Sequence, residues 1–83
     1  MHSTTIVVYG ADWCGDCRRA KQFLNQLGIS FEWIDIDCNR KAEEFVININ
    51  RGMRSIPTIV FEDGSILVEP TNEELADKVG MRV

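Results

Sequence analysis

A run of five β-forming residues, Thr5-Ile6-Val7-Val8-Tyr9, limits more than any other feature what this chain can fold into. Half-exposed strands alternate apolar and polar residues, whereas this run is β-branched and continuously apolar. A strand of this kind is buried on both faces, so its sheet must be covered by helices on both sides. We therefore expect a central strand at Thr5–Tyr9 and a fold of the α/β class.

The segment that follows Gly10-Ala11-Asp12-Trp13 has helical periodicity. Apolar residues recur at the i, i+3, i+4, i+7 spacing of one helix face, at Ala20, Phe23, Leu24 and Leu27. Gly28 supplies a C-terminal stop, so we predict a helix over Gly15–Leu27. The residues Ile29–Ile36 are rich in β-formers and predict a second strand parallel to the first, which completes a β-α-β unit.

The second half of the chain contains a further helix, a hairpin and a last helix. The first of these is predicted over Asn39–Asn50, with Asp37 or Asn39 as its cap, and it ends at Arg51-Gly52. One of its faces is apolar, formed by Ala42, Phe45, Val46 and Ile49.

The hairpin is indicated by Asp63-Gly64 between two apolar runs, Thr58–Phe61 and Ser65–Val68, because Asp-Gly in that setting is the strongest short-range turn signal. The segment Thr71–Glu74 has the pattern of a capping box and opens a last helix that is closed by Gly80. The predicted order of elements is therefore β-α-β-α-β-β-α.

Size and charge restrict the function. Residues 1–83 are the length of one small domain. Nine Lys and Arg against thirteen Asp and Glu give a net charge of −4 without runs of like charge, which argues against nucleic-acid binding and a polybasic membrane contact. The apolar runs are far shorter than the roughly 20 residues of a membrane-spanning helix, and no signal-peptide pattern is present. Three cysteines, an odd number, argue against a secreted disulfide framework, so we expect a cytoplasmic monomer.

Two cysteines stand in the sequence Trp13-Cys14-Gly15-Asp16-Cys17, at the junction of the first predicted strand and helix. Residues i and i+3 of a helix lie about 5–6 Å apart, so the two sulfurs can alternate between dithiol and disulfide. Cys14 lies at the helix start, where free N–H groups and the helix dipole stabilise a thiolate, and it is the predicted attacking sulfur. Cys17 lies on the apolar face and is the predicted resolving thiol, buried and protonated.

Two structural roles of this cysteine pair are the alternatives. A tetrahedral zinc site needs four ligands, and the only further candidates are Cys38 and His2. An inert disulfide across two intervening residues closes too small a loop to stabilise the fold much. We therefore expect no metal at this motif and interpret it as a redox centre.

A second motif is Ser55-Ile56-Pro57-Thr58, with Pro57 at the entry to a predicted strand. Together with the cysteine pair and the order of elements, it resembles the thioredoxin superfamily over nearly the whole chain. The resemblance implies a thioredoxin-like, glutaredoxin-sized fold, with a four-stranded mixed sheet and helices on both faces. It also implies that Pro57 is cis and lies against the cysteines, so that the backbone of Ile56 is free to pair with a bound thiol substrate.

Within that superfamily the chain is most similar to the glutaredoxin-like mycoredoxins, which act on mixed disulfides of mycothiol. The supporting segments are residues 42–46, 50–58, 63–65 and 70–71. Residues 68–73 have the sequence Val-Glu-Pro-Thr-Asn-Glu, where glutathione-binding glutaredoxins have a Gly-Gly pair followed by acidic residues. The resemblance therefore implies a low-molecular-weight thiol of the mycothiol type as co-substrate, no other cofactor, and a reductase system as partner.

Further side chains are candidates for tuning and binding. Trp13 either shields the sulfur and offers an apolar face to substrate, or simply packs. Asp16 either caps the helix or disfavours the Cys14 thiolate and makes the protein more reducing. Five basic residues border the site in the resembled fold: Arg18, Arg19, Lys21, Arg51 and Arg54. They are either solvated surface or attract a thiol's carboxylate, and Arg54 is the strongest candidate because it is close to Pro57.

The remaining cysteine and tryptophan have simpler expected roles. Cys38, at the end of the second strand, either forms mixed or intermolecular disulfides or packs passively, and we predict packing. Trp33 is expected in the core.

The predicted function is a thiol–disulfide oxidoreductase in which the Cys14 thiolate attacks a mixed or protein disulfide. Cys17 or a free low-molecular-weight thiol then resolves the intermediate. The alternative from another class is a binding module in which Cys14 and external thiols hold an iron–sulfur cluster across a dimer.

Overall fold

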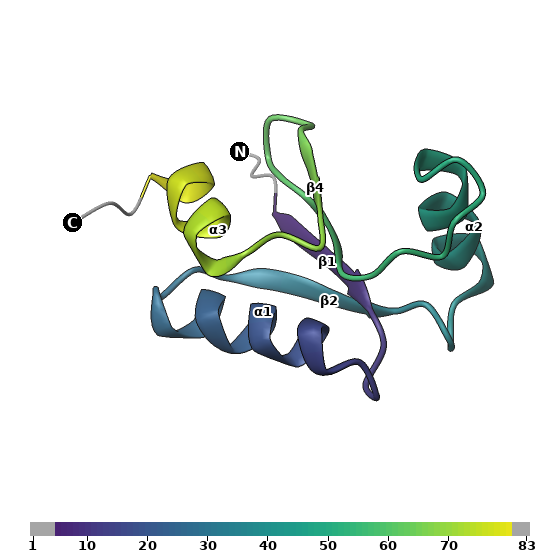
Figure 1. Cartoon of the computed structure of the whole chain (residues 1–83), viewed down its shortest axis with the longest axis horizontal. Helices are drawn as coiled ribbons and strands as arrows, with labels where there is room; N and C mark the ends of the chain where they lie inside the picture. The colour runs from purple at the N-terminus through teal and green to yellow at the C-terminus, as the bar shows by residue number, and fades with distance from the viewer. Residues whose placement is uncertain (1–4, 81–83) are drawn as a thin grey trace.

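The computed structural model describes residues 5–80, which contain four strands and three helices in the predicted order (Figure 1). The elements are β1 Ile6–Gly10, α1 Gly15–Gln26, β2 Phe31–Asp35, α2 Arg40–Ile49, β3 Thr58–Val60, β4 Ile66–Val68 and α3 Asn72–Val79. His2, considered above as a zinc ligand, lies outside the described residues.

The four strands form one mixed sheet in the order β2-β1-β3-β4. β1 runs parallel to β2, with Gly10 opposite Asp35, and antiparallel to β3, with Tyr9 opposite Thr58. The C-terminal ends of β1 and β2 therefore lie at the same edge as the start of β3. Loops that are far apart in the sequence meet at this edge, which carries the cysteine pair.

Helices cover both faces of the sheet, as predicted. α1 and α3 share one core with β1 and β3, formed by Ile6, Val8, Ala20, Leu24, Ile59, Phe61 and Leu75. α2 lies apart from these helices in Figure 1 and packs with Tyr9, Ile34 and Ile36. The prediction that β1 is buried on both faces is wrong in part: Val8 is fully buried, but Val7 and Tyr9 are only half-buried. The physical reason is that α2 covers less of its face than α1 and α3 together cover of theirs.

The helix ends follow the sequence signals. Asn39 caps α2, accepting a hydrogen bond of 3.0 Å from the Ala42 N–H, and Thr71 and Glu74 form the expected capping box of α3. Gly28 and Gly80 adopt the left-handed conformation, with φ of 74° and 75°. No helix among residues 5–80 is both long and apolar enough to span a membrane.

Gly10, the last residue of β1, lies directly beside the sulfur of Cys17. A Cβ atom at this position would lie 2.6 Å from the Cys17 Sγ and 2.8 Å from the Trp33 ring. Both neighbours are held in packed surroundings, since Cys17 is fully buried and Trp33 packs against two core clusters. Only glycine therefore lets α1 approach the strand closely enough to seat the Cys17 sulfur.

We predict that Gly10→Ala lowers the free energy of unfolding by about 1–3 kcal/mol, because overpacking forces buried neighbours to move. Gly15→Ala is the matched control, since its Cβ would meet only the Arg18 side chain, at 3.9 Å. Urea unfolding of the reduced proteins measures both changes. Equal stability of Gly10→Ala and wild type would contradict the close approach.

Candidate active site

Cys14 is the N-cap residue of α1. Its extended backbone ends the loop from β1, and its N–H donates to the Ala11 carbonyl at 3.1 Å. The Cys14 Sγ accepts a hydrogen bond from the Cys17 N–H at 3.2 Å, and the residue keeps 9% of its surface exposed. A sulfur in this position faces a backbone donor and the positive end of the helix dipole, both of which stabilise a thiolate. The predicted position of Cys14 is confirmed.

Cys17 lies one turn further along α1 and has no exposed surface. Burial is the main cause that raises its pKa to about 12, and the hydrogen bond with Cys14 and the charge of Asp16 act in the same direction. Cys17 therefore keeps its proton at neutral pH, as its place on the apolar face predicted. The two sulfurs differ in the way that an attacking and a resolving thiol require.

The segment before β3 packs against the cysteines. The Ile56–Pro57 peptide bond is cis, as the resemblance implied, and Pro57 is fully buried. The Ile56 side chain packs against the cluster of Ala11, Cys14 and Cys17. Within residues 5–80 the backbone N–H and C=O of Ile56 have no hydrogen-bond partner, so both are available to a substrate.

Side chains from three loops and from α2 form a polar network beside Cys14. The Trp13 indole N–H donates to Asp37 Oδ2 at 2.7 Å, and Arg54 pairs with Asp37 Oδ1 and, at 2.6 Å, with Glu43. The hydrogen bond from Trp13, and after it the one from Arg54, hold the pKa of Asp37 below its ordinary value. The carboxylates of Glu43 and Asp37 raise the pKa of Arg54. Trp13, Asp37, Glu43 and Arg54 are called the Asp37 network from here on.

The Asp37 network settles one alternative and adds residues that the sequence did not indicate. Trp13 is 64% exposed, so of its two alternatives the one in which it simply packs is wrong. Asp37 was considered only as a helix cap, a role that Asn39 takes, and Glu43 was not singled out. The missed contacts join positions 17 and 24 residues apart, and no local pattern in the sequence marks them.

Most of the basic residues near the site already have partners. Arg19 bridges Asp16, at 2.7 Å, and the carbonyl of Pro70, while Arg18 donates to the Asp12 carbonyl. The Lys21 ammonium lies 3.6 Å from the centre of the Trp33 ring, which is half-buried in the core as expected. Of these three, only Arg19 has its charge paired with a carboxylate, whereas Arg18 and Lys21 contact uncharged groups.

Cys38 lies in the turn after β2, where its N–H donates to the Asp35 carbonyl and its side chain is exposed. The prediction that it packs passively is wrong, because the tight turn directs the side chain into solvent. Among residues 5–80 no three His, Cys, Asp or Glu side chains come together as a metal site.

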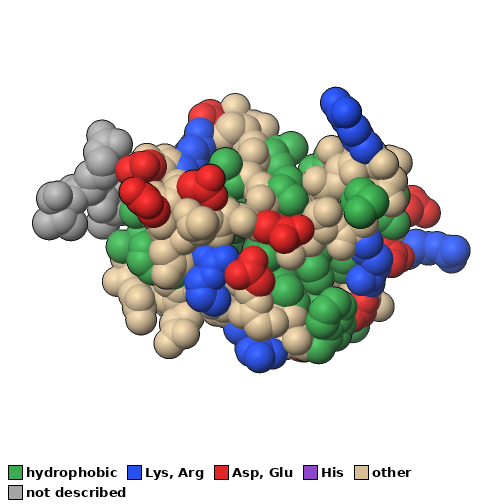
Figure 2. Space-filling model, in the orientation of Figure 1, with side chains coloured by type: hydrophobic (Ala, Val, Ile, Leu, Met, Phe, Trp, Pro, Cys, Tyr) green, Lys and Arg blue, Asp and Glu red, His purple; other side chains and the backbone are tan. Residues whose placement is uncertain are grey.

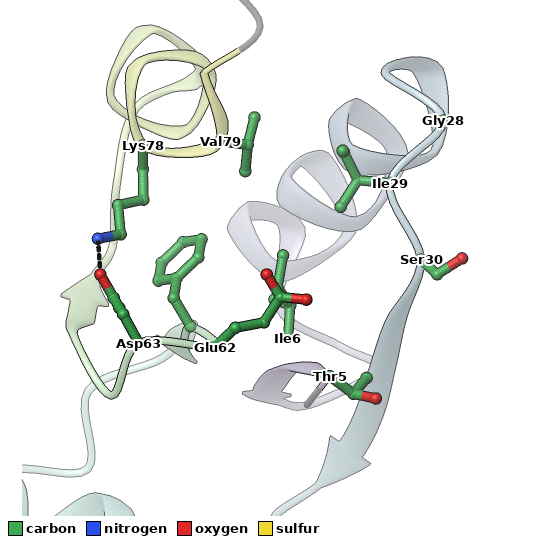
Figure 3. Close-up of a pocket in the computed structure, with 10 residues that line it drawn as sticks. Thr5, Ile6, Gly28, Ile29, Ser30, Glu62, Asp63, Lys78 and Val79 are labelled. Carbon is green, nitrogen blue, oxygen red and sulfur yellow. Dashed lines mark hydrogen bonds and ion pairs between the residues drawn. The ribbon is translucent and has the colours of Figure 1, made fainter. Parts of the chain in front are cut away.

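A cavity of about 460 Å³ lies at the other end of the sheet (Figure 3). It opens between the start of β1, the start of β2 and the end of α3, and Lys78 pairs with Asp63 at its rim. No cysteine lines it. The candidate active site is instead the exposed edge around Cys14, where hydrophobic side chains gather over the start of α1, at lower right in Figure 2.

Known proteins are similar to this chain in sequence and in fold. The family model described as glutaredoxin matches residues 6–66. The chain belongs to the glutaredoxin family. A Mycobacterium tuberculosis protein provisionally named a glutaredoxin is 39% identical over 79 residues, which cover 95% of this chain and 94% of that protein. Mycoredoxin 1 of Corynebacterium glutamicum is 32% identical over 76 residues, which cover 92% and 94%.

A solved structure supports the fold. The glutaredoxin of Archaeoglobus fulgidus superposes with a TM-score of 0.73 at 24% identity, covering 90% of this chain and 85% of that one. The thioredoxin-like fold predicted from the sequence is confirmed. The protein is accordingly a thiol–disulfide oxidoreductase of the glutaredoxin family, with a Cys14–Cys17 pair that fits a redox-active centre.

The raised pKa of Cys17 predicts a loss of stability in alkali. The unfolded chain releases this proton near the ordinary value of 9.0, whereas the folded reduced protein keeps it up to about 12. Between these values the unfolded state binds fewer protons, so the free energy of unfolding falls as pH rises, by at most about 1.4 kcal/mol per pH unit. The contribution of the Cys17 proton to stability is complete below pH 9.0 and is lost above about pH 12.

Urea unfolding of the reduced protein at a series of alkaline pH values checks this expectation. Cys17→Ala is the control, because it lacks the titrating group while other groups ionise as in the wild type. Parallel pH profiles of the two proteins would show that Cys17 does not hold its proton.

Proposed function

We propose that this protein reduces mixed disulfides between proteins and a neutral low-molecular-weight thiol of the mycothiol type. The observation that carries the proposal is the pairing of a capping sulfur, Cys14, with a buried thiol, Cys17, whose N–H donates to it at 3.2 Å. This arrangement supports a thiolate at the surface and a protonated thiol behind it.

The reaction begins when the Cys14 thiolate attacks the sulfur of the small thiol in the mixed disulfide. The protein substrate leaves as a thiolate and takes up a proton, and Cys14 is left in a disulfide with the small thiol. A second molecule of the thiol then attacks the sulfur of the first, which releases the Cys14 thiolate and the oxidised small thiol. Alternatively Cys17, once deprotonated, attacks the Cys14 sulfur, releases the small thiol and closes the Cys14–Cys17 disulfide.

Charge around the site favours a neutral thiol. Arg54 is compensated by two carboxylates, Asp37 and Glu43, and Arg19 is occupied by Asp16 and the Pro70 carbonyl. Glutathione carries two carboxylates that need free cations, whereas mycothiol is a cysteinyl amino-sugar conjugate without a free carboxylate. The Asp37 network has two carboxylates and one guanidinium, and its excess negative charge would repel the carboxylates of glutathione. This supports a preference for a neutral thiol over glutathione. The similarity to mycoredoxin 1 supports the same choice.

The remaining parts of the proposal follow from the reaction. The oxidised thiol must be reduced again, so a separate reductase system is the expected partner, and no cofactor is required beyond the thiol itself. Three free cysteines, one of them exposed, suit a reducing compartment, and we assign the protein to the cytoplasm as a monomer.

We predict that Cys14→Ser abolishes reduction of every disulfide, because the serine hydroxyl cannot replace the thiolate. Cys17→Ser is expected to keep most of the activity on small mixed disulfides, since the route through a second small thiol uses only Cys14. Turnover is measured with mixed disulfides of mycothiol, bacillithiol and glutathione on the same acceptor. Activity of Cys14→Ser would overturn the assignment, and preference for the glutathione substrate would overturn the choice of thiol.

We infer that Asp16 makes the cysteine pair more reducing, because a carboxylate in the first turn of α1 disfavours nearby thiolates. Its ion pair with Arg19 at 2.7 Å and its exposure weaken the effect. Asp16→Asn is therefore expected to raise the reduction potential by no more than about 30 mV at low salt, and by less at high salt. Equilibration with glutathione buffers at both salt concentrations measures it. An unchanged potential at low salt would leave Asp16 with only its favourable interaction with the dipole of α1.

A further inference from the structure

The Trp13 ring is held by one hydrogen bond. The side chain is 64% exposed, so packing does not fix its orientation. Its indole N–H donates to Asp37 at 2.7 Å, and a bond from a neutral donor to a carboxylate is stronger than one between neutral groups. The direction in which the ring faces, next to the nucleophile Cys14, therefore depends on where Asp37 is placed.

Asp37 itself is placed by the backbone. The preceding residue, Ile36, is buried, and its N–H donates to the Gly10 carbonyl at 2.9 Å, which ties the loop after β2 to the end of β1. The Asp37 N–H donates to the Asp35 side chain at 2.9 Å. These two bonds fix the turn before any side chain of the Asp37 network is added.

Each oxygen of the Asp37 carboxylate has its own donor. Oδ2 receives the Trp13 indole and Oδ1 receives the Arg54 guanidinium, which comes from the loop before Pro57. A single carboxylate thus joins the loop that carries the nucleophile to the loop that carries Ile56 and Pro57. In the proposed function, a disulfide substrate binds between these two loops.

We propose that Asp37 is a positioning residue for substrate: it holds the Trp13 ring as a preformed platform for the non-sulfur part of the small thiol. The proposal rests on the proposed function for the identity of that thiol. With its N–H engaged by Asp37, the ring offers its exposed apolar face to the rings of such a molecule, and fixing the ring before binding removes the entropy of ordering it. Asp37 does not touch the reacting sulfurs and acts through Trp13.

The first test does not depend on activity. In Asp37→Ala the indole N–H resonance of Trp13 in a ¹⁵N spectrum is expected to move and to exchange faster with water, while that of Trp33 stays in place as an internal reference. Glu43→Gln is the matched control, because it removes the other partner of Arg54 and leaves the Trp13–Asp37 bond intact. An unmoved Trp13 resonance in Asp37→Ala, or an equal shift in Glu43→Gln, would overturn the proposal even if no substrate were known.

The second test separates substrate positioning from the reactivity of Cys14. Asp37→Ala is expected to raise KM for the mycothiol mixed disulfide about fivefold, the worth of one ordinary hydrogen bond, with kcat nearly unchanged. Alkylation of Cys14 by iodoacetamide, which is too small to need the ring, is expected to keep its rate. A loss in kcat or in alkylation with unchanged KM would overturn the proposal, since Asp37 would then act on the nucleophile.

Trp13→Phe gives an independent variant at an exposed position, where unfolding is not a concern. It removes the indole N–H but keeps an aromatic ring, so Asp37→Ala should add little to KM when combined with it. Strictly additive effects of the two substitutions would mean that they do not act through a shared contact, and would overturn the proposal.

Discussion

The hydrogen bond from the Cys17 N–H to the Cys14 sulfur is the interaction on which the rest of the site depends. It makes a sulfur the N-cap of α1, a role that usually falls to the oxygen of Ser, Thr, Asp or Asn. A neutral thiol is a weak acceptor, and a thiolate is a much better one. The start of the helix therefore directs a backbone donor and the positive end of its dipole at the sulfur that attacks.

The sheet order explains why the site contains residues from three distant segments. β1 and β2 are parallel and β3 is antiparallel to β1, so two strand ends and one strand start share an edge. The loops after β1, after β2 and before β3 supply Cys14, Asp37 and Pro57 in turn. Gly10 is needed at the centre of this edge, because any side chain there would occupy the place of the Cys17 sulfur.

Local signals in the sequence predicted the elements well, because each depends on neighbours along the chain. The capping box at Thr71, the left-handed Gly28 and the helical spacing of the cysteines all fall in this class. The sequence did not reveal Asp37 or Gly10 as site residues, since their roles arise from contacts across the sheet. Cys38 was misassigned for the same reason: a free cysteine packs by default, and only the turn after β2 shows that it faces solvent.

The raised pKa of Cys17 links the two steps of the proposed reaction, the attack by Cys14 and the attack by Cys17. Of the causes that raise its pKa to about 12, burial belongs to the fold, but the hydrogen bond and charge of Cys14 belong to the reduced state of the site. When Cys14 enters a mixed disulfide it loses its negative charge, and these two contributions weaken. In the proposed route through Cys17, this thiol therefore becomes easier to deprotonate after the first step, when its thiolate would attack the Cys14 sulfur. Before that step, the buried proton keeps the two thiols from competing for the same substrate.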